Sequence, residues 1–494
     1  MLTQLSHRLT SWWPVWRQAS QPTSGVPLVR PHLGELAQQA PSQLPSFVCE
    51  SAAAQKYLAL LGGLNWAHFP ETPHRMGPQG APHAPFVAAL LVKLDKGLPS
   101  MPKLREYLVE QPALVWVLGF PLAASADYSW GYDVDRSLPT HRHMSRLLRE
   151  LPVAQCQFLL RSSVQLLQTA LPADVNFGDE ISLDTKHIIA WVQENNPKCY
   201  VPERYDKTRQ PQGDPDCKLG CKKKSNERKN EAAGETPTTE GLPASESLPK
   251  LEKGEYYWGY ASGVVATKVD KLGEFVLAEM TQTFDKADVS YFQPLMAQTE
   301  TNLGRAPSYG AFDKAFDAFY VYEYFDNVGG FAAVPWADRA DHHKTFNEQA
   351  LPLCEAGLAM PLISTVNKKK GCLVPHELGR HRCPLLFPAP SGETCPIQHK
   401  NWPKKGCVTS LPTSQGNRVR HQLDREGAEY KRIYDQRTAT ERINSQAKEL
   451  GIERPKLRNQ ASIANQNTLL YVLINLRGLK RIQRCAAAPP PPTT

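Results

Sequence analysis

Four residues close to the C-terminus have side chains and spacings that suit chemistry on a phosphate group. Arg437, Glu441 and Lys448 follow Tyr434 at offsets of three, seven and fourteen. At about 100° per residue these positions would share roughly 60° of arc on one helix. Two cations beside a carboxylate suit a metal ligand next to a bound phosphate. The alternative is structural, because Thr438 and Glu441 have capping-box spacing and Glu441 would then only close a helix N-terminus.

Asp184 lies in the middle of a segment whose pattern predicts a β-strand. Between Ile181 and Trp191 the odd-numbered positions are mostly apolar and can share one face, while Asp184 faces the other. Strands are depleted in Asp, so this residue is either a functional carboxylate or a solvent-facing residue of an edge strand. Metal-dependent phosphoryl transfer needs carboxylates brought together from separate elements on a rigid frame.

Asp313 follows a short apolar run, residues 309–312, and precedes a segment with helical spacing. We therefore expect it near the carboxyl end of a strand, where open α/β sheets place their ligands. Asp317, four residues later, is the rival candidate. For either acid the alternative is a structural role, with the carboxylate stabilised at a helix N-terminus by the helix dipole.

The elements that must position these acids fall into a helical part and a β-rich part. Residues 46–173 have apolar residues three and four apart and predict a helical N-terminal domain, with Ser100 and Thr140 as N-caps. This domain is compatible with a DNA-binding helix-turn-helix and equally with a plain helical bundle. Between residues 174 and 480, short β-rich runs alternate with helical stretches, which predicts an α/β fold with a mixed sheet and covering helices.

Two insertions interrupt the β-rich part, and both ends of the chain are of low complexity. Residues 194–254 are rich in Lys, Glu, Pro and Thr and are predicted to be a disordered basic insertion. Residues 338–429 are dense in His, Cys, Pro and basic residues and are expected to form an inserted subdomain. Residues 1–45 are predicted to be a poorly ordered leader and residues 481–494 a disordered tail.

The composition narrows the class of protein. No apolar run in the 494 residues approaches the ~18 residues that a membrane span needs. The N-terminus lacks a continuous apolar segment followed by a cleavage site, so we expect a cytoplasmic protein without a membrane partner. The net charge of +8 is a modest surplus of Lys and Arg, which favours a polyanion such as nucleic acid as the partner.

The cysteines raise the question of a structural metal. The chain has 11 of them without a repeating framework, which fits reduced thiols better than disulfides. The second insertion could supply four zinc ligands, yet its wide spacings contain no Cys-x-x-Cys knuckle, so we predict no zinc site. The residues considered are Cys372, Cys383, Cys395, Cys407, His376, His381 and His399.

Taken together, these residues resemble the DDE transposases of bacterial insertion sequences, in the insertion-sequence-four-like branch. That branch is known for a signature of Tyr, two residues, Arg, three residues, Glu, six residues and Lys. All of these spacings are kept here in Tyr434, Arg437, Glu441 and Lys448.

The two other acids of that family also have counterparts. Its first acid lies in a short strand like SLDTKHI, which points to Asp184, and its second in a motif like Asp-Lys-Ala-Phe-Asp, which points to Asp313. The resemblance covers about residues 179–479, and residues 137–151 look like the helical N-terminal region of related transposases. It implies a ribonuclease-H-like core that is interrupted before Glu441 by the inserted subdomain.

The resemblance also implies an enzyme. Asp184, Asp313 and Glu441 would be the catalytic residues and would hold two Mg²⁺ ions, with Mn²⁺ as a substitute. The activity would be endonucleolytic DNA cleavage followed by strand transfer at the ends of an insertion sequence.

The partners follow from that activity. Tyr434, Arg437 and Lys448 would bind phosphates of double-stranded DNA near the terminal inverted repeats, and target DNA would be a second partner. Bringing two DNA ends together implies a homodimer, and the place of action would be the bacterial nucleoid.

Two related functions stay open at this point. One is a catalytically inactive or regulatory DNA-binding relative, and the other is a nuclease of the same fold that cuts without joining strands. The cleavage route is open as well, because the family usually has a tryptophan close to the Arg of the signature, whereas Thr438 follows Arg437 here.

Overall fold

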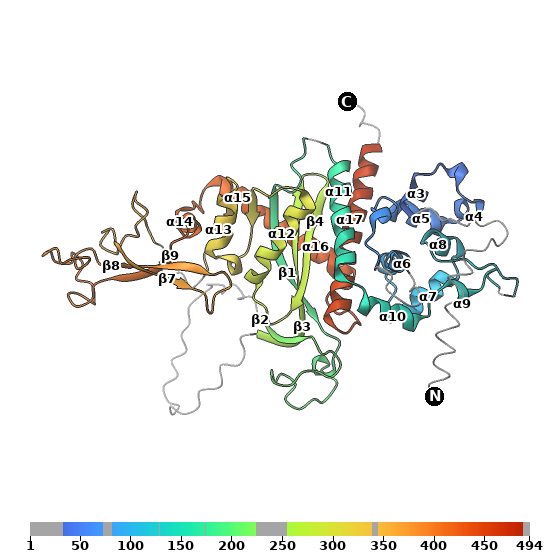
Figure 1. Cartoon of the computed structure of the whole chain (residues 1–494), viewed down its shortest axis with the longest axis horizontal. Helices are drawn as coiled ribbons and strands as arrows, with labels where there is room; N and C mark the ends of the chain where they lie inside the picture. The colour runs from blue at the N-terminus through green and yellow to red at the C-terminus, as the bar shows by residue number, and fades with distance from the viewer. Residues whose placement is uncertain are drawn as a thin grey trace, which may run out of the picture.

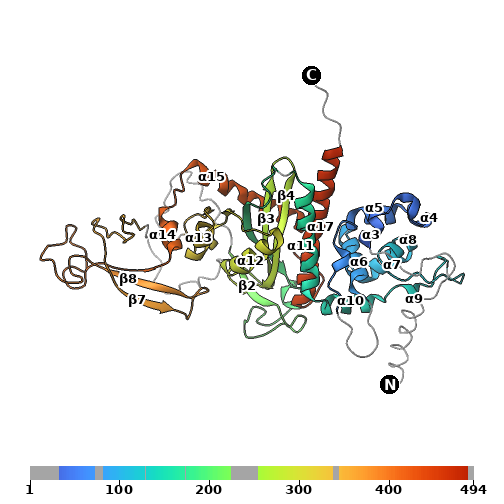
Figure 2. The same ribbon diagram turned by 45° about the horizontal axis from the view of Figure 1, so that its top comes forward.

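In the part of the chain that the computed structural model describes, a six-stranded mixed sheet lies at the centre with helices on both faces (Figure 1). From this centre the chain extends to a smaller sheet at one end of the long axis and to the N-terminal helices at the other. Figure 2 shows the same order after a turn of 45°. The structure describes residues 33–72, 82–127, 129–172, 174–223, 254–337 and 344–487.

Helices form in the first third where apolar residues lie three and four apart. Ser100 and Thr140 are N-caps, as predicted, because their side-chain oxygens accept hydrogen bonds from the backbone N–H groups of Lys103 and His143 at 3.4 and 3.2 Å. The helices are α3 (Leu33–Gln38), α4 (Ser46–Cys49), α5 (Ala52–Leu61), α6 (His83–Asp95), α7 (Met101–Val109), α8 (Pro112–Val117), α9 (Val134–Ser137), α10 (His141–Glu150) and α11 (Val153–Ala170).

The central sheet begins as an antiparallel meander and continues with parallel strands. Strand β3 pairs antiparallel with β1, β2 and β4, while β5 pairs parallel with both β1 and β6. The resulting order is β4–β3–β1–β5–β6, with β2 beside the first residues of β3. The predicted α/β class is therefore confirmed. The strands are β1 (Glu180–Ile189), β2 (Lys218–Lys223), β3 (Gly254–Val269), β4 (Gly273–Thr283), β5 (Tyr309–Ala311) and β6 (Phe331–Ala333).

Both faces of the sheet are covered. Residues of β3 alternate between two buried clusters: Tyr260 and Val264 belong to the one that contains residues of α16 and α17, and Ala261 and Val265 to the one that contains residues of α12 and α13. The alternation explains why β3 reads as a nearly continuous apolar run. The covering helices are α12 (Phe292–Leu303), α13 (Phe319–Asp326), α15 (Ala428–Tyr434), α16 (Thr438–Glu449) and α17 (Gln460–Ala487).

The N-terminal helices share their core with the sheet. One buried cluster runs from Leu33 of α3 through α5, α6 and α8 to Leu476 of α17 and includes Val264 of β3. Helix α11 lies alongside α17 between the N-terminal helices and the sheet (Figure 1). The predicted boundary at residue 173 therefore does not separate two cores. No helix in the described ranges is both long and apolar enough to cross a membrane.

Three predictions of disorder are wrong in part. Leu33 and Leu36 are buried against the core, so the leader is already helical within residues 33–38. Residues 194–223 fold by docking on the sheet: the Asn195 side chain bonds the backbone of Ala190 and Trp258, and β2 pairs with β3. Helix α17 continues to Ala487 because an alanine run favours helix. The rest of these segments, residues 1–32, 224–253 and 488–494, lies outside the described residues.

The second insertion is divided differently from the prediction. Strands β7 (Leu362–Lys368), β8 (His376–Arg382) and β9 (Val408–Pro412) form a separate antiparallel sheet that projects from the centre (Figure 2). Helix α14 (Gln415–Gln422) instead packs on α13 of the central fold. The predicted subdomain at 338–429 therefore ends before α14, and residues 338–343 lie outside the described residues.

A buried carboxylate joins the helices to the sheet. Glu279 of β4 is 1% exposed. It accepts hydrogen bonds from Ser262 at 3.0 Å, Thr281 at 2.7 Å, Thr468 of α17 at 2.6 Å and Gln157 of α11 at 3.3 Å. Burial raises the pKa of this carboxyl. A buried acid is tolerated here because its oxygens are saturated with donors.

We expect Glu279→Ala to lower the free energy of unfolding by about 3 kcal/mol or more, because several buried donors would lose their acceptor. Glu279→Gln keeps the volume and one acceptor oxygen, so its loss is smaller, about 1 kcal/mol. Urea unfolding followed by circular dichroism measures both, and Asp270→Ala, whose side chain is 91% exposed, is the control. A Glu279→Ala protein as stable as the control would show that the network does not stabilise the fold.

Candidate functional site

Asp184 lies on β1, and Asp313 lies at the matching position just after the end of the parallel neighbour β5. Ser182 and Ala311 form the last residue pair between β1 and β5, and each acid lies two residues further along its strand direction. Parallel neighbours are about 4.8 Å apart, so equal offsets place the two carboxylates at the same edge. The predicted places of Asp184, inside a strand, and Asp313, just after one, are confirmed.

The carboxylate of Asp184 is held from two sides. Its Oδ1 accepts a hydrogen bond from the Thr185 backbone N–H at 2.8 Å, and its Oδ2 accepts one from Asn444 Nδ2 of α16 at 2.9 Å. Burial raises the pKa of Asp184 to about 6, and the negative charges of Asp313 and Asp288 add to the rise. The carboxyl is therefore costly to ionise in this structure.

Asp313 is an N-cap and also one of three neighbouring acids, Asp184, Asp288 and Asp313, which we call the acid cluster. It is the N-cap of the 3₁₀ turn Lys314–Phe316, and its Oδ1 accepts a hydrogen bond from the Ala315 N–H at 2.8 Å. Burial raises its pKa in spite of this hydrogen bond, and the charge of Asp288 acts in the same direction. Asp313 therefore has the structural role of an N-cap and also lies beside Asp184.

Asp288 is a third acid at this edge that the sequence analysis missed. It begins the 3₁₀ turn Asp288–Tyr291 before α12, and Thr185 Oγ1 donates a hydrogen bond to its Oδ1 at 2.8 Å. Burial raises the pKa of Asp288. Its position depends on the path of the chain after β4, and it belongs to no spacing motif that would have identified it.

The Tyr-Arg-Glu part of the signature is brought close to the acids by a turn between two helices. Helix α15 ends at Tyr434, the 3₁₀ turn Asp435–Arg437 contacts β1 and β5, and α16 begins at Thr438. Arg437 Nη1 lies 2.7 Å from Glu441 Oε1, and the guanidinium carbon is 5.7 Å from the centre of the Tyr434 ring. The positive charge of Arg437 opposes the rise in the pKa of Asp184 and of Asp313.

Two expectations for this signature need correction. The capping-box alternative is wrong, because no side chain caps the start of α16 and Thr438 Oγ1 donates to the Asp435 carbonyl at 2.9 Å. The four residues also do not share one unbroken helix. Lys448 lies at the other end of α16, where its Nζ is 3.8 Å from Glu453 Oε1.

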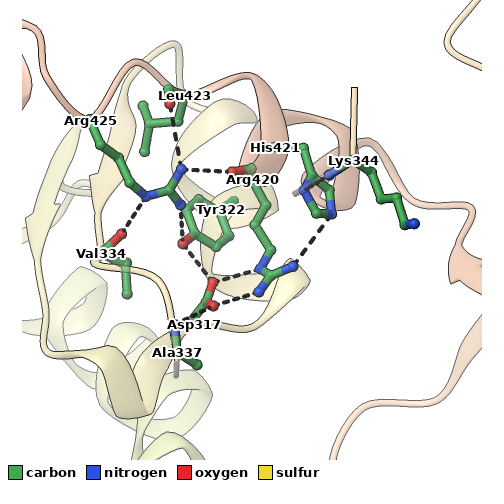
Figure 3. A network of polar contacts seen from close by, with 9 residues as sticks. All are labelled: Asp317, Tyr322, Val334, Ala337, Lys344, Arg420, His421, Leu423 and Arg425. Atoms are coloured by element: carbon green, nitrogen blue, oxygen red, sulfur yellow. Dashed lines mark hydrogen bonds and ion pairs between the residues drawn. The ribbon is translucent and has the colours of Figure 1, made fainter. Parts of the chain in front are cut away.

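Asp317, the rival of Asp313, is a structural residue. Its side chain is fully buried, and Arg420 of α14 donates to both of its oxygens at 2.6 and 2.5 Å (Figure 3). The Tyr322 hydroxyl and the Ala337 N–H complete its hydrogen bonds. Burial alone would raise the pKa of Asp317, but Arg420 holds it below its usual value. This ion pair fastens α14 to the turn after β5.

A cavity opens between the acids and the inserted sheet. Its volume is about 1340 Å³, and its lining includes Asp288 and Asp313 together with Lys344 and Lys400. Basic groups thus line the same cavity as two of the acids, and positive charge in a cleft attracts anions.

Side chains of the types that bind metals gather at two places, the acid cluster and the inserted part. Among the described residues, no three His, Cys, Asp or Glu side chains are placed to hold one metal ion as they stand. At the acid cluster, the Glu441 carboxylate is turned to Arg437. In the inserted part, the Cys407 thiol contacts those of Cys383 and Cys354, and Cys354 was not among the residues considered from the sequence.

Comparisons of the chain with protein-family models, curated proteins and solved structures find no match. The function is therefore inferred from the site itself.

We expect Asp184→Asn to stabilise the protein at pH 8 and to leave it unchanged near pH 4. The folded-state pKa of about 6 lies above the ordinary value of 3.8 for an aspartic acid, so ionisation destabilises the fold as the pH rises through 6. About two pKa units correspond to about 2–3 kcal/mol. Urea unfolding at both pH values, without divalent cations and beside Asp270→Asn, measures the difference. An equal effect at both values would contradict the assigned cause.

Stability should also separate Asp313 from Asp317. Asp317→Asn leaves the Arg420 guanidinium without its buried counter-charge and is expected to cost about 3 kcal/mol or more. Asp313→Asn removes a carboxylate from an acidic cluster and should cost less than about 1 kcal/mol. Thermal and urea unfolding of the two variants makes the comparison. Equal losses would mean that Asp313 too has a mainly structural role.

Proposed function

We propose that the chain is a DDE transposase of a bacterial insertion sequence, which cleaves and joins DNA with Asp184, Asp313 and Glu441. The observation that carries the proposal is the matching position of Asp184 on β1 and of Asp313 just after β5, with the turn that bears Arg437 in contact with both strands. Acids gathered from separate strands on a rigid sheet are what metal-dependent phosphoryl transfer requires.

The strand order supports a ribonuclease-H-like core. Three antiparallel strands, β4, β3 and β1, are followed in space by the parallel strands β5 and β6. The candidate residues come from the central strand, from the end of its parallel neighbour and from a helix near the C-terminus. The inserted sheet of β7–β9 lies in the chain between Asp313 and Glu441, where the resemblance places an inserted subdomain.

The acid cluster suits divalent cations that prefer oxygen ligands, Mg²⁺ or Mn²⁺. Asp184 and Asp313 offer carboxylates whose pKa values are raised by burial and by the negative charge of neighbouring acids, and a bound cation would relieve that repulsion. Glu441 would join them after leaving Arg437. When bound, the metal ions supply an activated nucleophile and stabilise the charge on the leaving oxygen.

The neighbouring side chains bind and orient the DNA in this proposal. Asn444 holds the Asp184 carboxylate in place, and Arg437, once released by Glu441, donates to a phosphate beside the acids. The Tyr434 ring holds the Arg437 guanidinium in position by a cation–π contact. Lys448 binds a phosphate further along α16. The N-terminal helices contact the terminal repeats, and a second copy of the chain holds the other DNA end.

Glu441→Gln is the decisive variant for this proposal. We expect it to abolish Mg²⁺- or Mn²⁺-dependent nicking of a duplex that carries the DNA flanking the gene. It should change the DNA affinity by less than about tenfold, or 1.4 kcal/mol, because the loss concerns metal ligation and not folding. Glu449→Gln makes the same chemical change on an exposed position of the same helix and is the control.

The products separate the related functions. Nicking at a fixed end followed by joining to target DNA supports the transposase, and nicking without joining identifies a nuclease of the same fold. DNA binding without cleavage by the unmodified protein would point to an inactive or regulatory relative. Full cleavage by Glu441→Gln would contradict the assignment of this residue.

A further inference from the structure

A second cavity lies at the other end of β1, away from the acid cluster. Its volume is about 1120 Å³, and it is lined by the residues after Ile189, by the loop 196–213 and by the loop that follows α16. Its charged lining residues are mostly basic: Arg204, Arg209, Arg454, Lys456 and Arg458, with Glu194 and Glu203 as the acids. No residue of the acid cluster and no residue of the signature lines this cavity.

Three of its cations are free to meet a ligand. Arg454, Lys456 and Arg458 are exposed, while Pro455 between them is buried and Leu457 is half-buried, so the loop is anchored by alternate residues. None of the three cations forms an ion pair within the described part of the chain. A fixed row of exposed cations is a binding surface for consecutive phosphates.

The two other arginines of the lining are already engaged. Arg209 forms an ion pair with Glu203 at 2.9 Å, and Arg204 donates to the Cys199 carbonyl at 2.5 Å. They shape the wall of the cavity, whereas the loop after α16 supplies the unneutralised charge.

Trp191 contacts Lys456, the middle one of the three exposed cations. Its side chain is 43% exposed, which corrects the expectation that it shares the apolar face of the strand, and Lys456 Nζ lies 5.2 Å from the centre of its ring. A cation over an indole is held by the quadrupole of the ring while its N–H groups stay available. Since the ring already carries a cation, we expect contacts to a phosphate backbone and not base stacking.

The loop is tied to the strand that bears Asp184. The Ile189 N–H donates to the Glu453 carbonyl at 2.8 Å, and the Glu453 carboxylate pairs with Lys186 at 2.6 Å. The cavity therefore has a fixed distance from the acid cluster. Ile189 is five residues beyond Asp184, which corresponds to about 17 Å along a strand at about 3.3 Å per residue.

We propose that this cavity binds the phosphate backbone of duplex DNA at a point about 17 Å, or roughly five phosphates at 3.4 Å of axial rise each, from the phosphate at the acid cluster. The inference rests on the proposed function for its distance from a cleaved phosphate. The contact is independent of base sequence, and it would set the direction in which the duplex leaves the site.

The double variant Arg454→Ala with Lys456→Ala tests the inference. Its control is Lys268→Ala with Lys271→Ala, which also removes two positive charges. These lysines lie at the opposite end of the β1–β3 pair, where Ile181 pairs with Thr267. DNA affinity is measured between about 50 and 200 mM salt on a duplex carrying the flanking DNA. Each lost phosphate contact reduces the slope of log K against log salt by about 0.9, so the double variant should lose about 1.8 and the control almost nothing.

A second measurement places the contact. Neutral methylphosphonate linkages are introduced one at a time along the duplex, and they should weaken binding of the unmodified protein at about five phosphates from the cleaved one. The same substitutions should have no effect on the double variant. Circular dichroism and thermal unfolding check that both variants are folded, which is expected because Arg454, Lys456 and Lys271 are exposed and Lys268 is partly exposed.

Each outcome decides between clear alternatives. An unchanged salt slope, or tight binding of inorganic triphosphate without any effect on duplex affinity, would overturn the inference. If the protein never cleaves DNA but the double variant still loses salt dependence, the proposed function fails and the duplex-binding cavity stands. If Glu441→Gln abolishes cleavage while the double variant binds like its control, the proposed function stands and this inference fails.

Discussion

The structure depends on one constraint, the placement of a carboxylate in the middle of a strand that is paired on both sides. Asp184 has β3 on one side, and β5 ends just before it on the other, so its flank is open only where Asp313 follows β5. Burial at this point makes the carboxyl costly to ionise and leaves few groups able to approach it. Three charged groups lie close to it, Asp313, Asp288 and Arg437, and the Asn444 amide donates a hydrogen bond to it. Everything proposed for the site follows from this opening at the end of β5.

A rigid frame is needed to hold acids that repel one another. The frame comes from helices on both faces of the sheet, and α17 connects it to the N-terminal helices. Asn475 of α17 accepts from the Val276 N–H and donates to the Val276 carbonyl, so the helix is bonded directly to β4. The buried network around Glu279 adds a second polar link between the same layers. Stability gained in these layers offsets the unfavourable burial of the acid cluster, a trade typical of functional sites.

Local patterns determined what could be predicted. The N-caps at Ser100 and Thr140 and the strand around Asp184 depend on residues a few positions apart, and they form as expected. The fold of residues 194–223 could not be predicted, because Asn195 finds its partners at Trp258, more than sixty positions away. Composition describes such a segment as disordered since it has too little apolar surface of its own. Asp288 could not be predicted as part of the site for the same reason, because only the folded chain brings it close to Thr185.

The ion pair between Arg437 and Glu441 matters for the proposed function because a metal ion and DNA would each compete for one of its partners. Both side chains are partly exposed, 33% and 49%, and such pairs contribute at most about 1 kcal/mol. Opening it is therefore inexpensive compared with the repulsion that a divalent cation would relieve between Asp184 and Asp313. On the proposed function, Glu441 turns to the cation as Arg437 turns to a phosphate, so metal and DNA favour the same rearrangement. Binding of either would then strengthen binding of the other, because linkage between two ligands of one rearrangement is reciprocal.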